Sequence, residues 1–117
     1  MNKQEVFNRV YRHLLAQGAR SQASDSPGCA YRGEKGRMCA VGCLIDDEHY
    51  DEHWNTSAVG EPEVLTALGA SLHCEIYEGD LPFLSDLQYV HDHENPLNWR
   101  PELDALARKH GLATPDA

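Results

Sequence analysis

Three of the four cysteines, Cys29, Cys39 and Cys43, lie close together in the sequence, and a group of thiols is the first feature that could do chemistry. Cys39 and Cys43 are four residues apart, so both could face the same way on a helical turn. Zinc sites usually have four ligands with short paired spacings such as Cys-x-x-Cys. The spacing here differs, and a fourth ligand such as Cys74 would have to come from far along the chain. We therefore expect small buried hydrophobic thiols, and zinc stays the weaker alternative.

A second pair with helical spacing is formed by His49 and His53, with Glu52 between them. Their order differs from the His-Glu-x-x-His motif, so the metalloprotease geometry does not follow from it. Histidines among carboxylates more often belong to solvated helix ends than to ligand sets. We therefore assign neither histidine as a metal ligand and expect no cofactor.

A third polar set consists of Gln88, His91 and Asp92, which are neighbours on a helical surface. One interpretation places His91 as the base for a thiolate at Cys39 or Cys43, oriented by Asp92 or Gln88. The other is structural, because polar groups at the edge of an apolar stripe must find hydrogen bonds and can attach the helix to a neighbouring loop. We favour the structural interpretation and assign no catalytic residue.

Apolar residues at helical spacing predict the elements that would position these groups. The clearest predicted helix spans residues 2–17, with Asn2 as its cap, Glu5 completing a capping box and Gly18 ending it. Further helices are predicted from about residue 61 to Gly69, over 81–93 with Asp80 as the cap, and over 98–110.

The cysteine-rich stretch between the first two helices predicts a β-hairpin over 29–39, with the turn Gly33-Glu-Lys-Gly36. Residues 40–45 then predict a short buried helix or turn. Gly42 within it costs roughly 1 kcal/mol relative to alanine, which is sensible if another backbone crosses closely there. Residues 71–79 are ambiguous, with an alternation typical of a strand.

Together these elements predict a mainly α fold, with four or five helices and one short β-hairpin packed on them. A chain of 117 residues corresponds to a single globular domain over residues 1–117. Within it we expect helix 1 over 1–18, the hairpin and short helix over 29–45, a helical remainder over 61–110 and a frayed tail over 112–117.

The composition restricts the partners. The chain has 19 acidic and 10 basic residues, a net charge of −9, and no basic stripe to offset repulsion from nucleic acid. We expect no direct nucleic-acid binding and a protein partner with a basic surface patch, although net negative charge also simply aids solubility. We expect no membrane span and no secretory signal, and four cysteines then favour free thiols in the cytoplasm.

Three motifs carry a resemblance: Tyr-Arg-Gly-x-x-Gly at 31–36, Cys-Ala-Val-Gly-Cys-Leu-Ile at 39–45 and Leu-Gln-Tyr-Val-His-Asp at 87–92. The chain resembles a group of small uncharacterised proteins of tailed phages and prophage-bearing bacteria, from the first helix to the last. The residues that carry the resemblance are Tyr31, Arg32, Gly33, Cys39, Ala40, Gly42, Leu44, Ile45, Tyr50, Leu87, Gln88, His91 and Asp92. The group has no established activity, so it supplies no catalytic residue. The resemblance implies a cytosolic accessory protein made during infection.

The resulting functional hypothesis is a non-enzymatic, acidic accessory protein that binds a protein partner, such as host or defence machinery. The alternative is a small thiol/His enzyme or a Cys/His metal-binding protein. A homodimer with a purely structural role is a third possibility.

Overall fold

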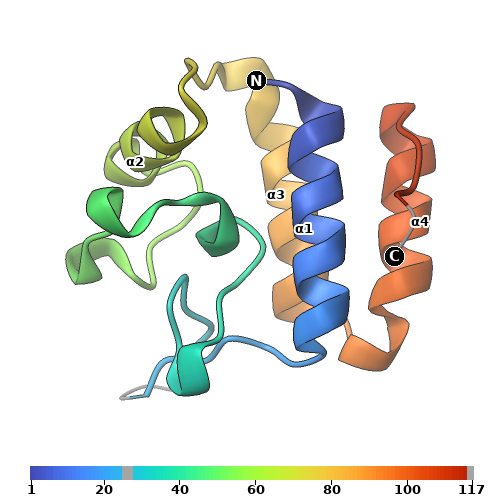
Figure 1. Cartoon of the computed structure of the whole chain (residues 1–117), viewed down its shortest axis with the longest axis horizontal. Coiled ribbons are helices and arrows are strands. Elements are labelled where there is room, and N and C mark those ends of the chain that lie inside the picture. Colours follow the sequence, from blue (N-terminus) through green and yellow to red (C-terminus); the bar gives the residue numbers. More distant parts are fainter. Residues whose placement is uncertain (25–27, 116–117) are drawn as a thin grey trace.

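The computed structural model describes residues 1–24 and 28–115, which form four α-helices joined by loops and short 3-10 turns (Figure 1). The helices are α1 (Lys3–Gln17), α2 (Pro62–Leu72), α3 (Leu81–His93) and α4 (Trp99–His110). The prediction of a mainly helical fold is confirmed. In Figure 1, α1, α3 and α4 lie side by side with similar axes, while α2 and the turns that precede it lie to one side of them.

Helix α1 has the cap and the end that its sequence predicts, but among the described contacts the Glu5 side chain does not accept the Asn2 amide that would complete the predicted capping box. The Asn2 side chain accepts a hydrogen bond from the Glu5 amide at 3.1 Å, and Gly18 adopts a φ of 67° to end the helix. One face of the helix is buried in the core through its apolar stripe of Val6, Phe7, Val10, Tyr11 and Leu14. Of these three helices, α4 is the one with extensive contacts to both others, and α1 lies in front of α3 in Figure 1.

Polar contacts fix α3 against α4. Asp86 of α3 accepts hydrogen bonds at 2.9 Å from both Lys109 and His110 of α4. Burial alone would raise the pKa of Asp86, but these two donors outweigh it and lower the pKa below its usual value. The two helices are therefore joined near the C-terminal end of α4 by a charge-assisted contact as well as by the core.

The predicted β-hairpin over 29–39 is wrong, because no strand forms within residues 1–24 and 28–115. Two isolated bridges are present instead, one between Arg32 and Met38 and one between Gln22 and Cys29. The turn between Arg32 and Met38 is the 3-10 turn η1 (Glu34–Gly36).

The pairing stops at the two hydrogen bonds that flank the Arg32–Met38 bridge, because neighbouring backbone groups bind other segments of the chain. The Met38 amide donates to the Gln17 side chain of α1 at 2.9 Å. The Tyr31 amide donates to the Asn55 carbonyl at 3.0 Å, and the Ala30 amide donates to the carbonyl of Ser21 at 3.0 Å. The stretch is thus a loop held on three sides rather than a two-stranded ribbon.

Gly42 begins the short turn η2 (Gly42–Leu44), which confirms the predicted short helix or turn at this place. A β-carbon on Gly42 would overlap the backbone of Tyr31. The expected close crossing of another backbone is therefore confirmed, and glycine is required there for contact rather than for conformation.

The end of α2 differs from the prediction. The helix continues past Gly69 to Leu72 and ends where His73 adopts a φ of 56°. The strand-like alternation over 71–79 does not produce a strand, since its first two residues complete α2 and its last two belong to the turn η5 (Glu78–Asp80). Asp80 accepts from the Tyr77 amide rather than capping α3 directly.

The C-terminal stretch contacts α1. The Ala113 amide donates to the Gln4 side chain at 2.9 Å, and Gln4 donates back to the Ala113 carbonyl at 2.8 Å. The tail over 112–117 was predicted to fray, and its last two residues, 116–117, lie outside the described residues. Residues 25–27, in the loop between α1 and Cys29, also lie outside them. None of the helices described is long and apolar enough to cross a membrane.

Candidate functional site

The polar set on α3 forms a buried junction centred on His91, whose side chain is inaccessible to solvent. The Ser21 amide donates to Nε2 of His91 at 2.9 Å. Because a backbone amide can only donate, Nε2 must accept, and the proton of the neutral ring is assigned to Nδ1. Nδ1 then donates to Oδ1 of Asp92 at 2.6 Å. His91 therefore attaches the loop after α1 to α3, as the structural interpretation expects.

Gln88 extends the junction to a third segment. Its Nε2 donates to Oδ1 of Asp92 at 3.0 Å, and its Oε1 accepts from the Val41 amide at 3.1 Å. Gln88 and His91 thus connect α3 to the loop at Ser21 and to the turn at Val41. Each ring nitrogen of His91 and both the amide nitrogen and oxygen of Gln88 therefore have a hydrogen-bond partner.

Two further contacts complete the end of α3. The Arg20 side chain donates to the carbonyls of His91 and Glu94, at 3.2 and 2.6 Å. These are terminal carbonyls of α3 without helical partners, so a cation is favourable there. The ring of Trp99 stacks on the ring of His91, with ring centroids 5.7 Å apart.

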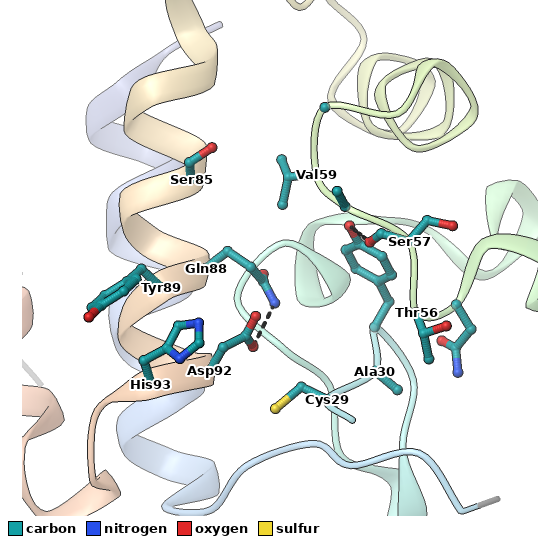
Figure 2. A pocket seen from close by; sticks show the side chains of 14 residues that line it. Cys29, Ala30, Thr56, Ser57, Val59, Ser85, Gln88, Tyr89, Asp92 and His93 are labelled. Atoms are coloured by element: carbon teal, nitrogen blue, oxygen red, sulfur yellow. Dashed lines mark hydrogen bonds between the residues drawn. The ribbon is translucent and has the colours of Figure 1, made fainter. Parts of the chain in front are cut away.

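A groove of about 300 Å³ opens beside this junction, between α3 and the loop over residues 55–60 (Figure 2). We call it the α3 groove. The α3 side contributes one helical face, with Ser85, Gln88, Tyr89, Asp92 and His93. Cys29 and Ala30 lie at one end in Figure 2, and Ser57 and Val59 lie on the opposite wall. Among the described residues, Asp92 is the only carboxylate that lines the groove, and no lysine or arginine does.

Cys29 is the cysteine that reaches this site. Ligand atoms of Cys29, His91 and Asp92 lie within 4.8 Å of one another. Burial and the neighbouring charge of Asp92 raise the pKa of the Cys29 thiol. A nucleophilic cysteine needs the opposite, a pKa lowered by positive charge. The environment of Cys29 therefore favours the neutral thiol.

The same three residues also fit a metal poorly. A metal at Nε2 of His91 would displace the Ser21 amide. A metal at Nδ1 would require the neutral ring to carry its proton on Nε2, where it would meet the Ser21 N–H. Either arrangement leaves a buried amide without an acceptor, which costs about 1–3 kcal/mol.

The sulfur atoms of Cys39 and Cys43 bond backbone groups of their own turn rather than a ring nitrogen of His91. Cys39 is fully buried, and its Sγ accepts from the Gly42 amide at 3.2 Å. Cys43 donates to the Ala40 carbonyl at 3.1 Å. Burial raises the pKa of both thiols to about 12. All four cysteines carry free thiols; Cys39 is the small buried group that we expected, and Cys43 is partly buried against the core.

His49 and His53 line a second hollow, of about 630 Å³, between α2 and the turns η3 (Asp47–His49) and η4 (Glu52–Trp54). Side-chain ligand atoms of His49, Asp46 and Glu48 lie within 4.8 Å of one another, and His53 is not in that group. The pair therefore shares a hollow without forming a joint ligand set among the described residues.

No family model matches the chain, and no curated protein or solved structure matches it either. The resemblance to phage proteins therefore stays an expectation, and the function must be argued from the residues.

The charges are segregated along the chain. Residues 46–99 contain thirteen acidic residues and no lysine or arginine. Seven of the carboxylates lie within residues 46–63, which we call the acidic segment, and all seven are exposed: Asp46, Asp47, Glu48, Asp51, Glu52, Glu61 and Glu63. Among the described residues, Asp47 is the only one of the seven paired with an arginine, Arg32 at 2.6 Å.

Sequence reasoning found Gln88, His91 and Asp92 but missed Ser21, which bonds His91, and Asn55, which lines the α3 groove. Ser21 is fully buried, although it lies in a polar stretch that reads as a surface loop. Asn55 makes paired hydrogen bonds with the backbone of Arg32, at 2.9 Å each. No local pattern marks either residue. The long run without lysine or arginine was the one signal in the sequence that could have located the acidic segment.

Proposed function

We propose that this chain is a non-enzymatic accessory protein that binds a protein partner through the acidic segment. The observation that carries the proposal is the concentration of seven exposed carboxylates in residues 46–63, six of them without an arginine or lysine partner in the described part of the chain. Unpaired surface carboxylates are free to meet the basic patch of a partner, and such complementarity steers association and fixes orientation.

The shape of this region supports the proposal. The acidic segment includes the turns η3 and η4 and reaches the start of α2, and these elements surround the 630 Å³ hollow. Glu48, Asp51 and Glu63 line that hollow, with the buried Trp54 at its wall. A lysine or arginine side chain could enter it and place its charge among several carboxylates.

The thiol chemistry of the alternative enzyme hypothesis lacks support from the geometry. Both ring nitrogens of His91 are occupied, by Ser21 and by Asp92, so the ring does not face a sulfur as a base. Cys39 and Cys43 have a pKa raised to about 12, which leaves almost no thiolate at neutral pH. The binding function is the one that the arrangement favours.

The resemblance to phage proteins guides the choice of lysate for a test. Tagged protein would be used to capture partners from a bacterial host lysate at low and at high salt, with each captured band identified. The decisive comparison uses a variant with four neutralised carboxylates in the acidic segment: Asp46→Asn, Glu48→Gln, Glu52→Gln and Glu63→Gln. We expect the wild type to capture a specific basic protein at low salt, and the variant to capture at least tenfold less.

A control with the same net charge separates a local surface from a general charge effect. It neutralises four exposed carboxylates elsewhere: Glu34, Glu75, Glu78 and Glu102. This control should capture the partner almost as well as the wild type. Equal losses in both variants, or capture that salt does not reduce, would remove the support for an acidic docking segment.

A further inference from the structure

We propose that the α3 groove binds the guanidinium group of an arginine side chain presented by the protein partner, with Asp92 as its counter-ion. This inference rests on the proposed binding function and names a second, more specific contact than the acidic segment provides. It concerns a site of about 300 Å³, which is wide enough for one long side chain.

Asp92 is positioned for this role before any ligand arrives. Both hydrogen bonds to its carboxylate, from Gln88 and His91, go to Oδ1. Oδ2 accepts neither of these bonds, and the side chain is 27% exposed where it lines the groove. The Cys29 thiol is a third, weak donor to this carboxylate. The carboxylate is thus held on a helix by two strong donors, while Oδ2 lacks a strong donor in the described part of the chain. Such pre-organisation lowers the entropic cost of binding.

The lining of the groove selects a cation. Among the described residues that line it, Asp92 is the only carboxylate and none is a lysine or arginine. The donors on Gln88 and His91 are already directed at Oδ1, and the neutral Cys29 thiol is only a weak donor. A positively charged donor from outside would therefore complete the hydrogen bonding of Asp92.

The rings at the edge of the groove favour a planar cation over a compact one. Tyr89 and His93 lie on α3 with ring centroids 4.6 Å apart, and the Tyr89 ring is exposed. In Figure 2 the His93 ring lies between Asp92 and Tyr89, and the Tyr89 ring points away from Gln88. A guanidinium group stacks on aromatic faces and bonds a carboxylate through its fork of N–H groups, whereas an ammonium group acts as a point charge. Arginine is therefore preferred to lysine.

The test is a titration followed by the backbone amide signals in two-dimensional NMR. The probe is N-acetyl-L-argininamide, and its neutral counterpart is N-acetyl-L-citrullinamide, in which a urea replaces the guanidinium. For a ligand of about fifteen non-hydrogen atoms we expect a Kd on the order of 1 mM. Shifts should concentrate on residues 55–60 and 85–93, and the citrulline probe should bind at least tenfold more weakly.

Variants assign the binding to the groove. Asp92→Asn keeps an oxygen acceptor for Gln88 and His91 but removes the charge, so binding should weaken at least tenfold. Because Asp92 also belongs to the buried junction, Ala58→Trp provides a second route: Ala58 is exposed on the opposite wall, and the larger ring would fill the groove. Glu102→Gln, on the exposed surface of α4, is the matched charge control and should bind as the wild type does.

Equal binding of the two probes would overturn the inference, as would chemical-shift changes centred on residues 46–54. Binding of the arginine probe to Ala58→Trp as tight as to the wild type would also overturn it, as would no binding to the wild type at a probe concentration 20 times the expected Kd. Failure of this titration would leave the proposed function standing if the acidic-segment variant still loses its partner. If the wild type captures no partner in a salt-dependent way but the arginine probe binds as expected, the arginine site is retained and the acidic docking segment is rejected.

Discussion

Replacing His91 tests whether the polar junction is a structural centre. The substitution His91→Leu keeps a side chain of similar size in a fully buried position, so it mainly removes polar contacts. The Ser21 amide loses its acceptor, which costs about 1–3 kcal/mol, and Asp92 loses a charge-assisted donor, worth about 1.5–3 kcal/mol. The stack on Trp99 adds about 0.5–1.5 kcal/mol. These contributions overlap, so we expect a loss of about 3–5 kcal/mol.

Urea unfolding followed by circular dichroism measures this loss, and a thermal midpoint lower by roughly 10–20 °C should accompany it. His53→Leu is the control, because His53 is exposed and its replacement should change the free energy of unfolding by less than about 0.5 kcal/mol. A His91→Leu protein within 1 kcal/mol of the wild type would refute the junction as a source of stability. Its Asp92 partner could then be assigned to binding alone.

Three further predictions concern stability and reactivity. Gly42→Ala should lower the free energy of unfolding by about 1–3 kcal/mol, because the new β-carbon would overlap the Tyr31 backbone. Gly60→Ala is the control and should be neutral or stabilising, because there is open space around Gly60. Thermal melts compare the two variants, and equal midpoints would contradict the close crossing. Stability should fall as the pH rises from 9 towards 12, because Cys39 and Cys43 have a pKa of about 12 in the folded protein against an ordinary value of 9.0, so the unfolded chain ionises first. Denaturant titrations of the wild type and of the double variant Cys39→Ala/Cys43→Ala should show that the free energy of unfolding falls less steeply with pH in the variant. Identical slopes would count against buried thiols. Iodoacetamide at pH 8 should leave Cys39 unmodified in the folded protein and modify it in urea, as peptide mass spectrometry can show; rapid modification of folded Cys39 would contradict its burial.

The helices were predictable because their signals are local. Asn2 and Gly18 mark both ends of α1, and Gly111 ends α4 with a φ of 68°. The apolar stripes identify the faces that become the core. Even the close crossing at Gly42 could be expected, because a glycine inside a short helical turn needs a reason of its own.

The loop structure was not predictable from local pattern. The stretch over 29–39 has the composition of a hairpin, but three of its amides bind Gln17, Ser21 and Asn55, which lie 9 to 24 residues along the chain from the amides they bind. Gly69 was expected to end α2, yet it is required within the helix because the Cys74 carbonyl comes within 2.8 Å of where its β-carbon would be. In both places contacts between distant segments override a local preference.

The same limit applies to the site. Gln88, His91 and Asp92 could be singled out because polar residues at the edge of an apolar stripe need partners. Neither the identity of those partners nor the groove beside them follows from the sequence. Both depend on where the loop over 55–60 and the loop at Ser21 come to lie against α3.

The uneven distribution of charge gives the molecule an electric dipole in addition to its net charge. Six of the ten basic residues lie on α1 and α4, whereas the acidic segment lies beside α2, on the opposite side of the molecule in Figure 1. In the field of an approaching polycation such a molecule rotates before contact, so that encounters begin with the carboxylates leading. Added salt shortens the range of this torque, and the rotational bias acts only within about 10 Å at 0.1 M ionic strength.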